Sequence, residues 1–365
     1  MCYQREYFYD ETTHAGQYPY DAELGIADGN GMSDGLSRVL IKLCTRLPFA
    51  EACAVLDELA HIQISASKAW RQTQAAGQRA RPALDPRPTT KASSQDTECM
   101  VITMDGCMAN VRGEGWKEVK LGAISEVCAG QDVKYNRHND AVQAVQAVQA
   151  VHSHAHSYVA HLGGPEGFGT KLLTEAQARR WSSGYQSVVV GDGAVWIWNL
   201  ATTDYAAAAH VVDWYHAKQH LCAAAELIFA GATGNDKVDK VDKVDKANTW
   251  VADMADLLYD GRALEIAQRL ERAATLAKPD TAKALLTEAG YFATNHERMQ
   301  YRDFQLAQLP IGSGTVESGA KQFKHRVSAA GMRWSRTGLE NMLPLRAATM
   351  SGTFDTFWRS ITPLR

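Results

Sequence analysis

The first strong pattern of hydrophobic positions lies in residues 34–78, where it predicts three consecutive helices. Leucines recur at helical spacing in the first part of this region, and Ser33 or Asp34 can cap the helix that they indicate. A second apolar stretch begins after Pro48, and Ser65 can cap a third, more basic segment that follows a short break. The pattern therefore predicts two helices, a turn and a third helix that is basic.

A helix, a short turn and a polar-capped basic helix are typical of a helix-turn-helix motif, although an ordinary helical hairpin has the same pattern. We predict a helix-turn-helix-like DNA-binding region at residues 34–78, with Lys68 and Arg71 of its last helix contacting DNA. The preceding residues 1–33 are rich in aromatic residues and glycine, show little periodicity and are expected to be irregular.

The remaining pattern predicts an α/β core that is interrupted by a helical insertion. Residues 79–97 are rich in Arg, Pro, Ser and Thr and are expected to form a linker. Strand-like runs follow at residues 99–104, 116–127, 188–190 and 207–215, and helical patterns at residues 216–229, 247–300 and 315–330. We accordingly place the core at residues 98–228, the helical insertion at 229–308, and the completion of the core with a basic C-terminal region at 309–365.

Composition excludes several classes of protein. The 365 residues are 45% hydrophobic, which is enough for a buried core. No apolar run reaches the roughly 18 residues of a membrane helix, and the N-terminus lacks the apolar segment of a signal peptide. We therefore expect no membrane partner and a cytoplasmic protein. The seven cysteines form no Cys-x-x-Cys pair, so no disulfide framework or zinc ribbon is indicated.

The distribution of charge is more informative than its sum. The net charge of −3 argues against a dedicated nucleic-acid-binding protein. Basic residues nevertheless gather in two zones, at residues 68–91 and 310–365, which would suit a polyanion track. Ordinary scatter of charge explains the same counts about equally well.

Three acidic residues occupy positions that are suited to metal-dependent chemistry. Asp105 and Asp192 each end a strand-like run beside a glycine, where Asp is a common turn residue but also a frequent ligand. Glu317 follows a glycine-rich loop at the start of a helix that continues with Lys321, Lys324 and Arg326. Carboxylates for Mg²⁺ beside cations for phosphate are the groups that phosphodiester cleavage requires.

Several segments in this order resemble bacterial insertion-sequence DDE transposases of the ISKra type, which are relatives of the Mutator-like transposases. The segments are Met104-Asp105-Gly106 with residues 115–120, then residues 157–163, 191–199 and 212–221, and lastly residues 312–318 with 331–335. The resemblance covers about residues 15–350.

The resemblance implies a ribonuclease-H-like catalytic domain with a helical insertion between the second Asp and the Glu. It assigns Asp105, Asp192 and Glu317 as the catalytic triad and as ligands of two Mg²⁺ ions, or of Mn²⁺. By the same analogy, Asp213 and His216 form an Asp-x-x-His signature that orders the site. The residues alone favour a simpler explanation, in which His216 is a hydrogen-bonded side chain at the end of a strand.

These observations predict a DNA transposase that binds the terminal inverted repeats of its element, cleaves a strand and joins it to target DNA. It would act as a homo-oligomer on double-stranded DNA, associated with the nucleoid when bound. Besides Lys68 and Arg71, the expected DNA contacts are Lys321, Lys324, Arg326, Arg333 and Trp334. For Trp334, stacking on a base and packing in a core are both open. The alternatives are a catalytically inactive, transposase-derived DNA-binding protein and a ribonuclease-H-like nuclease that only hydrolyses.

Overall fold

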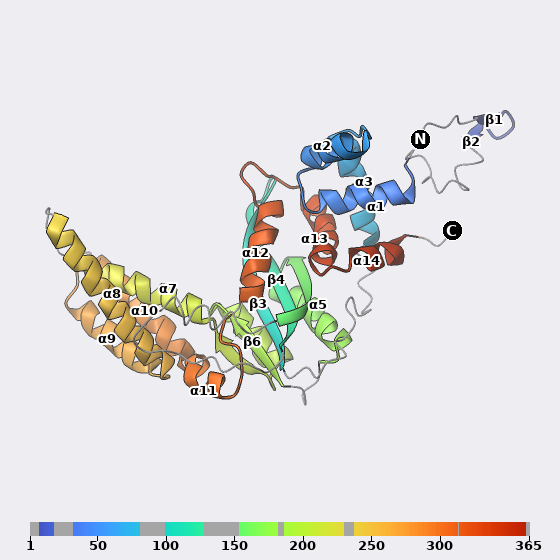
Figure 1. Cartoon of the computed structure of the whole chain (residues 1–365). Helices are drawn as coiled ribbons and strands as arrows, with labels where there is room; N and C mark the ends of the chain where they lie inside the picture. Colours follow the sequence, from blue (N-terminus) through green and yellow to red (C-terminus); the bar gives the residue numbers. More distant parts are fainter. Residues whose placement is uncertain are drawn as a thin grey trace. The chain divides into compact units, whose positions relative to one another are not determined.

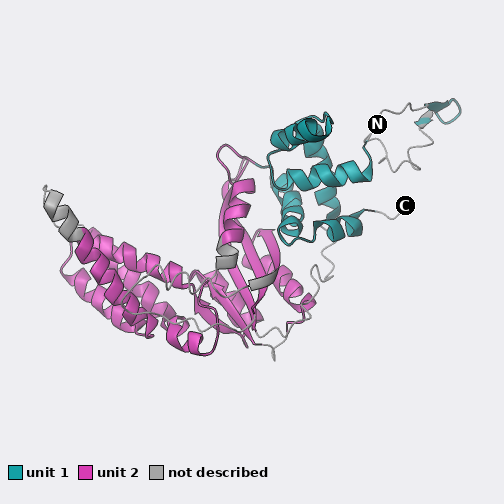
Figure 2. Cartoon of the chain, in the orientation of Figure 1, with its two compact units in different colours: residues 1–85, 334–365 teal, residues 86–333 magenta. Residues whose placement is uncertain are grey.

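A computed structural model describes residues 7–17, 32–80, 99–127, 153–181, 186–229, 237–312 and 314–362. The chain forms two compact units (Figure 2). Unit 1 consists of Met1–Asp85 together with Trp334–Arg365, and unit 2 consists of Pro86–Arg333. The stretch that we expected to complete the core at residues 309–365 is thus divided between the units. The predicted linker lies almost wholly outside the described residues.

Unit 1 is helical and confirms the three helices that the hydrophobic pattern predicts. They are α1 (Asp34–Cys44), α2 (Phe49–Ala60) and α3 (Ala66–Ala80). The hydroxyl oxygens of Ser33 and Ser65 accept hydrogen bonds from the third residue beyond each, at 3.3 and 3.2 Å, which caps α1 and α3. His61 ends α2 in the left-handed conformation, with φ of 53°. A short hairpin of β1 (Phe8–Asp10) and β2 (Ala15–Gln17) lies in the segment that was expected to be irregular.

Two C-terminal helices, α13 (Arg336–Met350) and α14 (Phe354–Ile361), pack onto α1 and α3. The approach of α3 to α13 requires a glycine, because a Cβ at Gly77 would overlap the backbone of Asn341. Beside it, Asn341 Nδ2 donates to Gln74 Oε1 at 2.9 Å. No helix is predicted at the positions of α13 and α14, and nothing in the sequence indicates that they belong with the N-terminal helices.

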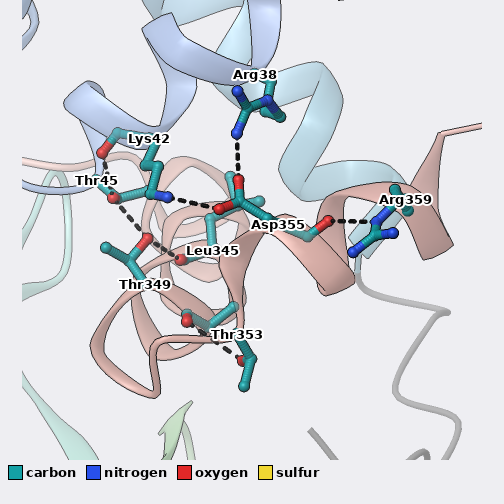
Figure 3. A network of polar contacts seen from close by, with 9 residues as sticks. Arg38, Lys42, Thr45, Leu345, Thr349, Thr353, Asp355 and Arg359 are labelled. Atoms are coloured by element: carbon teal, nitrogen blue, oxygen red, sulfur yellow. Dashed lines mark hydrogen bonds and ion pairs between the residues drawn. The ribbon is translucent and has the colours of Figure 1, made fainter. Parts of the chain in front are cut away.

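Polar contacts also join the two ends of the chain within unit 1 (Figure 3). Asp355 of α14 accepts from Arg38 and from Lys42, the latter at 2.8 Å, and the Thr45 and Thr349 hydroxyls lie 2.8 Å apart. Hydrogen bonds from Lys42 and Arg38 lower the pKa of Asp355. These side chains are largely exposed, so the ion pairs contribute less than about 1 kcal/mol, and apolar burial holds the helices together.

Unit 2 contains a five-stranded mixed sheet in the order β5-β4-β3-β6-β7 (Figure 1). Its strands are β3 (Cys99–Val111), β4 (Gly115–Val127), β5 (Ser153–Leu162), β6 (Ser187–Gly191) and β7 (Ala209–Val212). β3 pairs antiparallel with β4 and parallel with β6, and β7 is parallel to β6. All four predicted strand runs are present. β3 does not end at Asp105 as expected, because β4 pairs with it as far as Val111.

Helices cover both faces of the sheet. On one face, a Cβ at Gly122 of β4 would contact Phe168 and Leu172 of α5 (Pro165–Ala178). On the other face, Gly319 of α12 (Gly314–Val327) lies against the ring of Tyr158 of β5. α6 (Val195–Asp204) follows β6 directly and adds Ile197 and Trp198 to the core.

The predicted insertion at residues 229–308 is helical in the part that the structure describes. It comprises α8 (Lys237–Tyr259), α9 (Ala263–Thr275), α10 (Pro279–Asn295), the 3₁₀ turn η2 (His296–Met299) and α11 (Tyr301–Leu306). Together with α7 (Trp214–Phe229) these helices form a bundle that extends from the sheet (Figure 1). One apolar core runs from the sheet into the bundle. None of the described helices has the length and apolar content needed to cross a membrane.

Candidate active site

Asp105, Asp192 and Asp213 fall on one row across three parallel strands. β3 and β6 pair from Met100↔Ser187 to Thr103↔Val190, so partner residues differ by 87 in number. Asp105 and Asp192 keep this difference and lie two positions beyond the last pair. β6 and β7 end with Gly191↔Val212, so Asp192 and Asp213 lie one position beyond that pair. Because neighbouring strands are about 4.8 Å apart, the row brings three carboxylate-bearing residues to the same edge of the sheet.

Asp105 lies in a half-buried environment on the face of the sheet that α12 covers. Burial is the main cause that raises its pKa, and the charge of Asp192 raises it further. The same pKa is lowered by the hydrogen bond from the backbone N–H of Gly106 and by the charges of Lys324 and His216. These mutual effects indicate that groups from β3, β6, α7 and α12 share one electrostatic environment.

Asp192 is held at the start of α6 by backbone hydrogen bonds. Its Oδ1 accepts from the N–H of Ala194 at 2.9 Å, and its carbonyl oxygen accepts from the Tyr291 hydroxyl at 3.1 Å. Gly193, the next residue, has φ of +104°, a conformation that favours glycine. The sharp turn after β6 therefore determines the direction of the Asp192 side chain.

The Asp213-x-x-His216 pair begins α7. Asp213 is buried, with 5% of its surface exposed, and its Oδ1 accepts from the backbone N–H of His216 at 2.9 Å. The carboxylate therefore caps the helix that carries His216 toward the row. The position of Asp213 on the row also makes it a neighbour of Asp192.

The third predicted acid, Glu317, lies in the first turn of α12, and its side chain is outside the described part of the chain. Residues 317 and 324 are seven apart, so they lie on the same face of the helix. Lys324 of that face acts electrostatically on Asp105 and on the neighbouring Cys107. Position 317 thus shares a helix face with Lys324.

The predicted DNA-contacting residues differ in exposure. Arg71, Lys321, Lys324 and Arg333 are exposed, and Lys68 is half-buried. Arg326 is a correction, because with 1% of its surface exposed it lies inside the protein and cannot meet DNA in this conformation. Trp334 is also buried, at 6%, which favours the packing alternative over base stacking.

Tyr291, which the sequence did not single out, contacts Asp192 and belongs to a cluster with His220 and Glu288 in the helical bundle. Tyr291 of α10 stacks on His220 of α7 with ring centroids 3.6 Å apart, and His220 Nδ1 lies 2.6 Å from Glu288 Oε2. Burial is the first cause that raises the pKa of Tyr291 well above its usual value, followed by Asp192 and Asp213. No sequence signal links these positions, because 68 residues separate His220 from Glu288 and 99 separate Asp192 from Tyr291.

The donor set fits a hard divalent cation. Two carboxylates are brought together although burial and the charge of Asp192 disfavour the ionised form of Asp105, and a bound cation would relieve that cost. Within the described side chains no group of three or more His, Cys, Asp or Glu residues is arranged to hold a metal ion. Glu317, outside those side chains, is the third donor that the sequence predicts.

Substituting Asp105→Asn is expected to raise the unfolding temperature of the metal-free protein at neutral pH. In the folded protein the pKa of Asp105 lies above its ordinary value of 3.8. As the pH rises through the interval between the unfolded-state and folded-state pKa values, the folded state therefore loses stability relative to the unfolded state. Below that interval the carboxyl is protonated in both states, so the advantage of the variant should vanish. Calorimetry in the presence of a chelator at neutral and acidic pH measures both effects.

Added Mg²⁺ or Mn²⁺ should then stabilise the wild type more than the Asp105→Asn protein. Asp253→Asn, an exposed change on α8, provides the control. An Asp105→Asn protein that is less stable than the wild type at neutral pH without metal would contradict the electrostatic picture of this site.

Comparison with known proteins gives two matches. The model of the family described as "Uncharacterised protein family (UPF0236)" matches residues 178–360, which include Asp192, Asp213, His216 and Glu317. The "UPF0236 protein in vanSb 3'region" of Streptococcus gallolyticus is 27% identical over 81 residues. That stretch spans 22% of this chain and 18% of the relative.

Proposed function

The chain belongs to the uncharacterised protein family UPF0236, and from this premise we propose that it is a DNA transposase that cleaves and transfers DNA strands with Mg²⁺. The observation that carries the proposal is the row of Asp105, Asp192 and Asp213 at one edge of three parallel strands. The resemblance of its motifs to ISKra-type transposases gives the same three functional blocks in the same order.

A ribonuclease-H-like core is part of this proposal. It is supported by a mixed five-stranded sheet whose parallel strands carry the two predicted aspartates. A helical segment separates Asp192 from the helix that bears Glu317, as the resemblance implies for the insertion. The proposal that the core is ribonuclease-H-like rests on these features together and not on any one strand.

Each residue has a defined part in the proposed chemistry. Asp105, Asp192 and Glu317 would hold two Mg²⁺ or Mn²⁺ ions, which supply charge stabilisation at a phosphodiester. Lys324, exposed beside Asp105, would contact a phosphate oxygen. Asp213 fixes the start of α7 and so orients His216.

Two in-line substitutions at phosphorus make up the reaction. In the first, water attacks the phosphorus at the transposon end, the P–O bond to the 3′ oxygen breaks, and that oxygen leaves as a 3′-hydroxyl. In the second, this hydroxyl attacks a phosphorus of target DNA and displaces another 3′ oxygen. Because both are phosphoryl transfers of the same geometry, one set of carboxylates can serve both.

Unit 1 would supply recognition of the element's ends. Along α3, Arg71 and Trp70 are exposed and Lys68 is half-exposed, so cations and an aromatic ring share one helix. Contacts of these cations with the DNA backbone would make binding dependent on salt. Pairing of two ends implies a homo-oligomer on DNA.

The experiment that tests the function uses the full chain with duplexes that carry the flanking inverted repeats and with Mg²⁺ or Mn²⁺. A transposase gives nicked ends and strand-transfer products that a chelator abolishes. End binding without any cleavage favours the inactive DNA-binding alternative, and nicking without transfer favours a nuclease. Arg71→Ala should weaken end binding, whereas Arg272→Ala on α9, with the same loss of charge, should not.

A further inference from the structure

The helical bundle contributes a compact polar and aromatic cluster at its end nearest the sheet. Tyr291 stacks on His220 at 3.6 Å between centroids, with an interplanar angle of 20°. Glu288, one helical turn before Tyr291 on α10, lies 2.6 Å from His220 Nδ1. The His216 and His220 rings meet edge to face, with their centroids 5.1 Å apart. These contacts fix the Tyr291 ring from two helices.

The Tyr291 ring in turn contacts the turn that carries Asp192. Its hydroxyl donates to the Asp192 carbonyl oxygen at 3.1 Å. A Cβ at Gly193 would lie only 2.6 Å from Tyr291 Cε2, so the ring lies directly over the backbone of Gly193. Since Gly193 also has φ of +104°, a glycine is required there both for the backbone conformation and for the approach of the ring.

Tyr291 packs against the apolar core of unit 2, and its hydroxyl in addition donates to the carbonyl of the peptide between the candidate ligand Asp192 and Gly193. The Asp192 carboxylate accepts from the N–H of Ala194, and the carbonyl of the same residue accepts from Tyr291. Two hydrogen bonds therefore fix Asp192 within one turn. Such support is what a functional carboxylate needs to keep a fixed geometry.

We propose that Tyr291, held by His220 and Glu288, is a positioning residue that fixes the Asp192–Gly193 turn and orients the Asp192 carboxylate toward a divalent cation. The helical insertion thereby acts as a support of the site as well as a separate bundle. The catalytic consequence rests on the proposed function, whereas the fixing of the turn does not.

The test compares full-length Tyr291→Phe, which keeps the stacked ring and loses only the hydroxyl, with the wild type. Leu286→Ala, an exposed change on the same helix, is the matched control. Amide hydrogen exchange in residues 191–195 reports the turn, and titration with Mn²⁺ reports the carboxylate. We expect exchange to become about three- to tenfold faster and Mn²⁺ binding to weaken by a similar factor. In the cleavage assay kcat should fall while KM for DNA is unchanged.

A second variant, Glu288→Gln, removes the charge that pairs with His220 and should give a smaller effect in the same direction. Unchanged exchange and unchanged Mn²⁺ binding in Tyr291→Phe would overturn the proposal. Faster exchange with unchanged Mn²⁺ binding would also overturn it, because the tyrosine would then support the turn only. If the wild type binds no Mn²⁺, the metal-dependent function and the orienting role both fail, and exchange alone decides whether Tyr291 fixes the turn.

Discussion

Substituting Asp192→Asn is expected to lower Mg²⁺-dependent cleavage and strand transfer by about a thousandfold, while binding to the terminal repeats stays close to that of the wild type. Asparagine keeps an oxygen that can accept from the backbone N–H of Ala194, so the turn after β6 should persist. What it removes is the negative charge that is proposed to hold a cation together with Asp105. Loss of one preorganised electrostatic group in an active site commonly costs about 10²–10³ in rate.

Rates of nicking on labelled duplexes and a mobility-shift titration measure the two effects separately. Asp105→Asn and Glu317→Gln should behave in the same way, because the three acids are proposed to hold the same ions. Asp253→Asn on α8 removes an exposed carboxylate elsewhere and serves as the control. If Asp192→Asn cuts DNA at the wild-type rate, the assignment of the row as the active site is wrong.

Substituting Arg179→Met is expected to lower the free energy of unfolding of unit 2 by about 3–5 kcal/mol. The side chains of Arg179 and Glu126 are 0% and 4% exposed, and Nη2 lies 2.8 Å from Glu126 Oε1. Nη1 also donates to the Ile124 carbonyl at 3.0 Å and to the Ser157 hydroxyl at 3.1 Å. Removing the guanidinium leaves a buried carboxylate without its cation at the place where the register of β4 and β5 shifts.

Urea-induced unfolding measures this loss, and two further variants separate its causes. Arg269→Ala breaks an ion pair with Glu265 whose side chains are 46% and 31% exposed, so it should cost less than about 1 kcal/mol. Glu126→Gln combined with Arg179→Met should recover part of the loss, because no buried charge remains. Equal costs for Arg179→Met and Arg269→Ala would contradict the importance of the buried pair.

Local pattern was sufficient for much of the secondary structure. Ser33 and Ser65 were recognised as caps because a hydroxyl before an amphipathic run has a local partner in the next turn. Runs of apolar positions located four of the five described strands of unit 2 but missed β5, and they set the end of β3 six residues too early. That boundary depends on pairing with β4, which the sequence near Asp105 does not report.

Burial separated residues that look alike in the sequence. Lys324 and Arg326 are two positions apart on a basic helix, yet the first is exposed and the second is 1% exposed. A helix turns by about 100° per residue, so neighbouring cations face different directions, and only the packed structure shows which direction is solvent. The prediction that Arg326 contacts DNA failed for this reason.

By itself the sequence determined the three N-terminal helices of unit 1, the α/β character of unit 2, its helical insertion and the identity of the acidic residues. Each of these depends on side chains close together in the chain, whose periodicity and capping are local properties. Only the tertiary structure decided that α13 and α14 join the N-terminal helices and that Asp105, Asp192 and Asp213 share one row. It alone brought Tyr291 to Asp192. Strand register and helix packing are set by contacts between distant segments, which no local pattern contains.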